Sequence, residues 1–232
     1  MTNSRIIALC VLGASGKMGK RIVELALHDP AFAPTLTNLE CCDMIIDFSS
    51  PKATESHLQA AILANKPLVI GTTGHTPEER SLIETAAKTI PILFSPNFSF
   101  GMALCLETAA RLGKALYGSC TIDIIETHHI HKKDRPSGTA LALARAIGNG
   151  KTVLETPENL PRKKEEILIH SIRSQEVVGE HTLILECEHE RIELKHTAHS
   201  RDAFAQGALI GAKFLIQQPP GLYSLKDLFL QI

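Results

Sequence analysis

The chain has 232 residues, of which 44% are hydrophobic, so it can build one large or two small domains around an apolar core. Its net charge of -1 and pI of about 6.8 exclude the basic excess of a nucleic-acid-binding protein, and its apolar runs are too short to span a membrane. The N-terminus lacks the features of a signal peptide, so we expect a cytoplasmic protein.

The first predicted element is a continuous apolar strand at residues 6–12, as in the centre of a parallel sheet. A Gly-x-x-Gly-x-x-Gly turn follows at residues 13–19, and residues 21–27 then show helical spacing. Strand, glycine turn and helix in this order are typical of a Rossmann domain, where the turn and the helix N-terminus bind pyrophosphate. We expect a nicotinamide cofactor to contact Gly13, Ala14, Ser15, Gly16, Lys17 and Met18.

The segment of residues 31–42 is short for a Rossmann domain, because it must hold a second strand whose end contacts the adenosine ribose. Residues 34–38 are the candidate for a shortened second strand, and the next strand is predicted at residues 44–48. We assign no residue to the ribose, so the sequence leaves the choice between NADH and NADPH open.

Two later strands, at residues 68–70 and 91–94, are also followed by polar loops. Since ligands of parallel sheets bind at the carboxyl ends of the strands, we expect these loops to join the cofactor site. Their candidate cofactor-binding residues are Gly71, Thr72, Thr73, Ser95, Pro96, Asn97 and Phe98. Ser50 and Pro51 are expected to start a helix that runs to about residue 64, and Thr76 and Glu79 form a predicted capping box.

The second half of the chain is richer in alternating strands. Alternation of apolar and polar residues predicts strands with one wet face at residues 120–126, 167–172, 182–188 and 191–196. Helices are expected at residues 102–116 and 201–217, the latter capped by Ser200, and a surface loop at residues 148–161. Together these elements predict an α+β domain with an open mixed sheet beside a Rossmann-like domain of the α/β class.

The most informative stretch is residues 126–140, Glu-Thr-His-His-Ile-His-Lys-Lys-Asp-Arg-Pro-Ser-Gly-Thr-Ala. Imidazoles transfer protons near neutral pH, and ammonium groups attract anions. Ser137, Gly138 and Thr139 are placed to open a helix, whose free backbone N–H groups suit a carboxylate or phosphate. The stretch therefore predicts a reaction on an acidic substrate, although a solvated loop with an ordinary helix cap has a similar composition.

The cysteine and histidine patterns give no sign of a metal site. Six cysteines are present without a CxxC pair, which favours free thiols, most of them buried, in a cytosolic protein. His128, His129 and His131 lack the i, i+4 spacing of helical zinc pairs, so no metal is expected.

Residues 126–140 resemble the signature of the dihydrodipicolinate reductase family, Glu-x-His-His-x-x-Lys-x-Asp-x-Pro-Ser-Gly-Thr-Ala. The resemblance extends over nearly the whole chain. It includes Gly-x-x-Gly-Lys-Met-Gly at residues 13–19, Gly-Thr-Thr-Gly at 71–74, Ser-Pro-Asn-Phe at 95–98, Ser-Arg-x-x-Phe-Ala-x-Gly-Ala at 200–208 and the closing stretch 221–225.

The resemblance implies a reductase that uses NADPH or NADH to convert 4-hydroxy-tetrahydrodipicolinate to tetrahydrodipicolinate. It implies a dinucleotide-binding domain at residues 1–99 and 205–232, and a substrate-binding and oligomerisation domain at 100–204. It also implies a homotetramer, and a substrate that is a small cyclic dicarboxylate. By the resemblance, His128 donates or accepts a proton, Lys132 donates a proton and binds substrate, and His129, Ser137, Gly138 and Thr139 bind the substrate carboxylates.

Three alternatives remain open from the residues alone. A different dehydrogenase with the same two domains would share the glycine turn but would not need the cradle at residues 137–139. A non-catalytic nucleotide sensor would not need His128 or Lys132. A zinc hydrolase is disfavoured by the histidine spacing.

Overall fold

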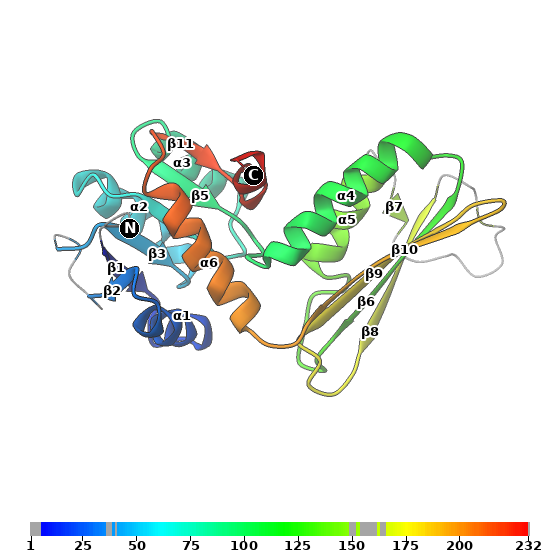
Figure 1. The fold of residues 1–232 in the computed structure, drawn as a ribbon, viewed down its shortest axis with the longest axis horizontal. Helices are drawn as coiled ribbons and strands as arrows, with labels where there is room; N and C mark the ends of the chain where they lie inside the picture. Colours follow the sequence, from blue (N-terminus) through cyan, green and yellow to red (C-terminus); the bar gives the residue numbers. More distant parts are fainter. Residues whose placement is uncertain are drawn as a thin grey trace. The chain divides into compact units, whose positions relative to one another are not determined.

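The computed structural model describes residues 6–35, 39, 41–148, 152–153, 162 and 166–231. The chain forms two compact units. Unit 1 consists of Met1–Phe100 and Arg201–Ile232, and unit 2 is Gly101–Ser200. Each unit has its own sheet, and helices pack on that sheet (Figure 1).

The sheet of unit 1 has six parallel strands in the order β11-β5-β4-β3-β1-β2, as expected for a Rossmann-like domain. The two inner strands β3 and β4 consist of buried residues only, which explains why their sequences are apolar except for Asp47 at the end of β3. The strands are β1 (Ile7–Leu12), β2 (Phe32–Pro34), β3 (Met44–Asp47), β4 (Leu68–Ile70), β5 (Pro91–Phe94) and β11 (Gly221–Tyr223).

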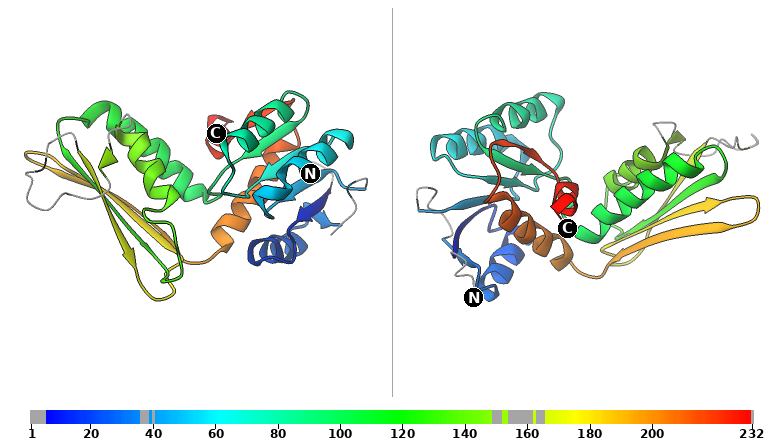
Figure 2. Two further views of the ribbon diagram at one scale, coloured as in Figure 1. Left: turned by 180° about the vertical axis from the view of Figure 1, so that it is seen from behind. Right: turned by 45° about the horizontal axis from the view of Figure 1, so that its top comes forward.

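Helices cover both faces of this sheet (Figures 1 and 2). One face carries α1 (Lys17–His28) and α6 (Asp202–Leu215), and the other carries α2 (Thr54–Leu63) and α3 (Pro77–Ala86). Two 3-10 segments, η1 (Pro51–Ala53) and η2 (Leu225–Gln231), complete the unit. A Cβ added to Gly207 would lie 1.7 Å from the carbonyl oxygen of Phe98, so only glycine lets α6 approach the loop after β5 this closely.

Three expectations for unit 1 need comment. The second strand starts at Phe32, two residues before the expected start at Pro34, because Phe32 pairs in parallel with Ile7 and fills the core. Residues 36–38 of the expected strand lie outside the described part of the chain. The helix expected from Pro51 starts as a 3-10 turn, and Ser50 makes no side-chain cap. The capping box of Thr76 and Glu79 is confirmed, since each side chain bonds the other residue's backbone N–H.

Unit 2 contains a five-stranded mixed sheet in the order β10-β9-β6-β8-β7. Its helices α4 (Phe100–Leu116) and α5 (Gly138–Gly148) pack on one face, over a core formed by residues such as Ile122, Ile124, Leu183 and Ala144. The strands are β6 (Thr121–His128), β7 (Thr152–Val153), β8 (Ile167–Arg173), β9 (Gly179–Glu186) and β10 (Arg191–Ala198). Most of the loop expected at residues 148–161 lies outside the described residues, but β7 shows that part of it is a strand.

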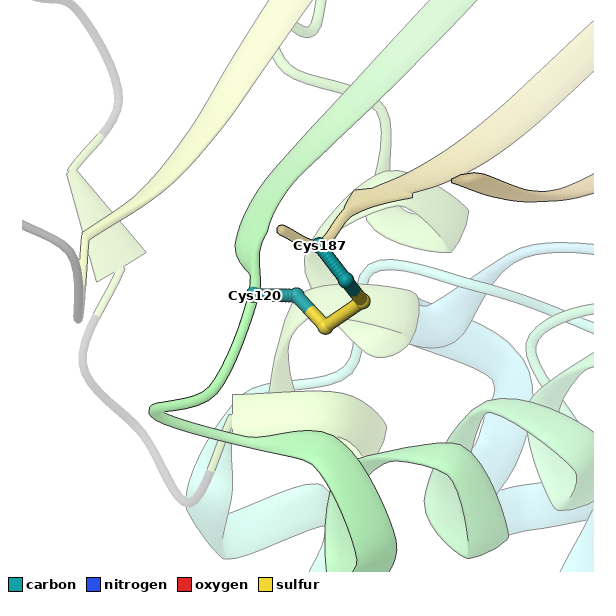
Figure 3. The surroundings of a disulfide bond; sticks show 2 residues. All are labelled: Cys120 and Cys187. Carbon is teal, nitrogen blue, oxygen red and sulfur yellow. A yellow bond between two sulfur atoms is a disulfide. The ribbon is translucent and has the colours of Figure 1, made fainter. Parts of the chain in front are cut away.

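The expectation that all cysteines are free thiols is wrong. Cys120 and Cys187 form a disulfide, with their Cα atoms 4.3 Å apart (Figure 3). Thr121 pairs with Glu186 in the antiparallel ladder of β6 and β9, so the two cysteines face each other one residue beyond it. This pairing depends on strand register between residues 67 positions apart, which cysteine spacing does not reveal.

Candidate active site

The turn after β1 is shaped by its glycines. Gly13 adopts a φ of +83°, and a Cβ there would lie 2.4 Å from the carbonyl oxygen of Phe48. A Cβ on Gly19 would lie 2.1 Å from the carbonyl oxygen of Gly13, so α1 meets the turn through glycine as well. Gly16, the N-cap of α1, is exposed, and an added Cβ would lie 3.3 Å from the carbonyl oxygen of Gly13, a tight contact but less severe than at Gly13 or Gly19. Gly13 and Gly19 therefore build the turn, and Gly16 keeps the start of α1 open.

A buried carboxylate at the end of β3 joins two neighbouring loops of unit 1. Asp47 is 1% exposed, and its Oδ1 accepts hydrogen bonds from the Ser49 backbone N–H at 2.9 Å and the Thr72 hydroxyl at 3.2 Å. Its Oδ2 lies 2.8 Å from Nδ1 of His57 in α2. The sequence analysis gave Asp47 and His57 no role, although a charged residue ending an otherwise apolar strand was a usable signal.

An aromatic contact connects the next two strand ends. The ring of Phe48 packs directly on Gly71, where a Cβ would lie 2.1 Å from it, and its centroid is 5.5 Å from that of Phe98. In the loop after β5, Asn97 uses its side-chain oxygen to accept the Ser99 backbone N–H at 2.8 Å. The loops after β3, β4 and β5 are thus fixed to one another before any ligand binds.

The predicted cofactor-binding residues lie at the carboxyl edge of the unit 1 sheet, most of them on loops and Lys17 and Met18 in the first turn of α1, but they differ in exposure. Ser15, Gly16, Lys17, Thr73 and Pro96 are exposed, Gly13, Ala14, Met18, Gly71 and Asn97 are half-buried, and Thr72, Ser95 and Phe98 are buried. A glycine-rich turn at an exposed helix start fits the pyrophosphate of a dinucleotide. The buried members support the loops, and the exposed ones are free to contact a ligand.

In unit 2, the helix-covered face of the sheet changes from apolar to polar along β6. Ile122 and Ile124 belong to the core, whereas Glu126 and His128 follow on the same face. In register with Glu126 lie Ser171 on β8 and His181 on β9. Arg173 is in register with His128. The signature histidine is therefore part of a polar cluster that three strands build, and the sequence analysis missed Arg173 and His181.

Glu126 is the centre of this cluster and is fully buried. It bonds Nδ1 of His128, accepts the Arg173 guanidinium at 2.9 and 3.0 Å, and accepts the Ser137 backbone N–H at 3.3 Å. Burial would raise the pKa of Glu126, but the hydrogen bonds from His128 and Arg173 outweigh it and lower that pKa to about 2. Because an ionised carboxylate only accepts hydrogen bonds, Nδ1 of His128 carries a proton.

Lys132 lies in the loop that joins β6 to α5. Its Nζ forms an ion pair of 2.8 Å with Asp134, and its carbonyl oxygen accepts a bond from Nε of Arg173 at 3.3 Å. Asp134 also accepts the backbone N–H of Gly138. The Asp134 carboxylate therefore contacts Lys132 and the start of α5, the two groups that the sequence assigns to a carboxylate of the substrate. His129 is half-buried and His131 exposed.

Ser137 caps α5, as its position in the signature predicts. Its hydroxyl oxygen accepts the Ala140 backbone N–H at 3.1 Å, and the Nε2 atom of His181 lies 3.1 Å from the same oxygen. His181 is 5% exposed, and its ring packs edge-on against His128 with centroids 5.0 Å apart. Burial, and next the nearby His128, lower the pKa of His181 to about 3, so His181 is neutral at physiological pH.

Among the described residues, no group of three or more His, Cys, Asp or Glu side chains is placed to hold a metal ion. Within that same part of the chain, no helix is both long and apolar enough to cross a membrane.

Comparison with known proteins places the chain in one family. Residues 33–98 match the family described as dihydrodipicolinate reductase, N-terminus, and residues 101–229 match dihydrodipicolinate reductase, C-terminus. The chain is 41% identical to 4-hydroxy-tetrahydrodipicolinate reductase of Akkermansia muciniphila, covering 96% of this chain and 97% of the relative. It is 42% identical to the reductase of Sulfurimonas denitrificans, with coverage of 96% and 98%.

The fold agrees with these sequence matches. The dipicolinate-bound dihydrodipicolinate reductase of Paenisporosarcina sp. TG-14 has a TM-score of 0.79 to this structure at 23% identity, covering 96% of this chain and 99% of that one. With its two matched family regions and relatives above 40% identity along almost its full length, the chain belongs to the dihydrodipicolinate reductase family.

Proposed function

We propose that this chain is a reductase that converts 4-hydroxy-tetrahydrodipicolinate, NAD(P)H and a proton to tetrahydrodipicolinate, NAD(P)+ and water, a step of diaminopimelate and lysine biosynthesis. The observation that carries the proposal is the polar cluster of unit 2. It brings His128 and the start of α5 onto one buried carboxylate, and Arg173 connects that carboxylate to the loop of Lys132. A nucleotide sensor would not need this proton-transferring assembly.

In this proposal the residues of unit 2 bind the substrate and transfer protons to and from it. Lys132 donates a proton to the carbon that becomes electron-rich during reduction, and His128, with Nδ1 held by Glu126, donates or accepts a proton through Nε2. His129, Ser137, Gly138 and Thr139 bind the carboxylates. Asp134 must then release Lys132 and the Gly138 N–H when the substrate arrives, so binding exchanges one carboxylate for another.

Unit 1 binds the cofactor, NADPH or NADH, which supplies the hydride when bound. The exposed turn of Ser15, Gly16 and Lys17 would hold the pyrophosphate at the start of α1. The loops after β4 and β5, fixed by Asp47 and Phe48, would orient the nicotinamide half. In this assignment the first domain corresponds to unit 1 and the substrate domain to unit 2.

The proposed partners are a small cyclic dicarboxylate and three further copies of the chain. The helix-free face of the unit 2 sheet supports the tetramer, because Ile125 and Ile184 lie on it and no helix among the described residues covers it. We also propose a cytoplasmic location, where reduced nicotinamide cofactors are regenerated. Nucleic acid and membranes are not partners in this proposal.

The test is an assay of the purified chain with freshly prepared substrate, in which nicotinamide absorbance is followed over time. We expect cofactor oxidation that depends on substrate and is lost in Lys132→Ala. Binding of dipicolinate, measured by calorimetry, gives a second readout that needs no turnover. A chain that binds NADH but neither binds dipicolinate nor oxidises NADH with substrate would instead be a nucleotide sensor.

A further inference from the structure

The ion pair of Glu126 and Arg173 contacts every segment of the proposed substrate site. Glu126 reaches His128 at the end of β6 and the backbone N–H of Ser137 before α5. Arg173 donates to the carbonyl oxygens of Lys132 at 3.3 Å and Asp134 at 2.6 Å. Proton-transferring groups and anion cradle thus depend on one pair of side chains.

The environment of the pair makes it suitable as a rigid connector. Glu126 is fully buried, and the side chain of Arg173 is only 13% exposed. A planar guanidinium with several donors suits this task, because it holds a carboxylate with two bonds and still reaches backbone carbonyls. Ile172 provides a further carbonyl at 2.7 Å. The geometry leaves Arg173 little freedom to rotate.

The other side of His128 packs against β9. Gly179 of β9 lies beside the ring, where a Cβ would be 3.1 Å from Nε2. His181 packs on the ring from β9 but bonds Ser137 through its own Nε2. The contacts therefore hold His128 at Nδ1 and keep its Nε2 edge next to a residue without a side chain.

We propose that Glu126 and Arg173 are positioning residues of the reductase: Glu126 fixes the Nδ1–H tautomer of His128, and Arg173 fixes the loop that carries Lys132. Neither residue transfers a proton itself. This inference rests on the proposed function, and it adds a residue from β8, outside the signature.

The experiment uses the full chain with Glu126→Gln and Arg173→Met. We expect kcat to fall at least tenfold in each, because the reacting groups lose their orientation. Arg162→Gln is the matched control. Arg162 makes the same kind of bonds, to Asp123 at 2.7 Å and to the carbonyl oxygen of Ile122 at 2.6 Å, but roughly 16 Å from His128 along β6. Its kcat should stay within about threefold of wild type.

A spectroscopic readout separates positioning from general loss of structure. In protein with 15N-labelled histidine, the His128 signals, assigned by their loss in His128→Asn, should show a protonated Nδ1 in the wild type and in Arg162→Gln. Glu126→Gln should shift His128 toward the Nε2–H tautomer, because an amide also offers a donor. If the single variant does not fold, Glu126→Gln with Arg173→Met removes both buried charges and carries the same expectation.

The outcomes are distinct. An unchanged tautomer together with a wild-type kcat in Glu126→Gln would overturn the inference while the wild-type assay still supports the reductase. An inactive wild type that shows the expected tautomer would instead contradict the proposed function and leave the positioning geometry intact. Equal losses in Arg162→Gln and Arg173→Met would reduce Arg173 to a purely structural role.

Discussion

At the scale of residues, the described structure separates groups that can react from groups that hold them. Lys132 is paired but partly exposed, whereas Glu126 and His181 are buried. The signature showed which residue types occur, but not that Asp134 pairs with Lys132 or that His181 touches Ser137. The first contact depends on the conformation of the loop and the second on strand register between residues far apart in sequence, neither of which a linear pattern encodes.

The first prediction distinguishes proton transfer from anion binding. Lys132→Ala should lower kcat by roughly 10²- to 10⁴-fold, because it removes the proposed acid of the reduction. Thr139→Ala should chiefly raise KM, because it removes a carboxylate contact at the start of α5. Steady-state kinetics measure both, with circular dichroism as the folding control. A near-wild-type kcat in Lys132→Ala would leave His128 as the proton donor.

A second prediction concerns stability against pH. The folded pKa of His181 lies at about 3, below its ordinary value of 6.5, so its stabilising effect is complete above pH 6.5 and is lost as pH falls toward about 3. The pKa of Glu126 is likewise lowered, from its ordinary value of 4.5 to about 2. Its stabilising effect of about 3 kcal/mol is complete above pH 4.5 and is lost as pH falls toward about 2.

Urea unfolding at a series of pH values tests these assignments. His181→Gln should flatten the free energy of unfolding between pH 6.5 and 4.5, and Glu126→Gln should flatten it chiefly below pH 4.5. If His181→Gln instead acted chiefly below pH 4.5, and Glu126→Gln between pH 6.5 and 4.5, the result would contradict the claim that burial keeps His181 neutral.

At the scale of elements, apolar runs predicted the inner strands of the unit 1 sheet well. The strand expected at residues 68–70 is the fully buried β4, and that at 91–94 is β5, whose two middle residues are buried, because buried strands have uninterrupted apolar sequences. The ends of elements were harder. β6 continues to His128 because Glu126 and His128 find partners across the sheet, so polar residues extend a strand that composition alone would end earlier.

The helix start after β1 gives a third prediction. Gly16 has φ of −76° and its nearest obstacle is the Gly13 carbonyl oxygen at 3.3 Å from an added Cβ, so Gly16→Asp should fold and cap α1. Its negative charge should nevertheless weaken NADH binding, since it stands where the pyrophosphate is proposed to bind. Calorimetry should show a much smaller loss for the neutral cap Gly16→Ser. Equal binding by wild type and Gly16→Asp would show that the turn does not hold the pyrophosphate.

At the scale of the whole molecule, the short second strand bears on cofactor choice. β2 ends at Pro34 opposite Leu9, three residues before β1 ends at Leu12, so it stops short of the edge where a ribose is usually contacted. We expect weak discrimination, with kcat/KM for NADH and NADPH within roughly tenfold, about 1.4 kcal/mol. A hundredfold difference in either direction would mean that a specific ribose contact exists.

The disulfide of unit 2 makes a closed covalent ring from Cys120 to Cys187, and this ring contains Glu126, His128, Lys132 and Arg173. Closing a ring of this size is worth about 4 kcal/mol by the chain-entropy estimate. A protease cut anywhere inside it would leave both fragments attached, so the nicked chain should run as one band on a denaturing gel and separate only after a reductant is added. The residues of the proposed substrate site therefore stay covalently connected even when one peptide bond between Cys120 and Cys187 is cut.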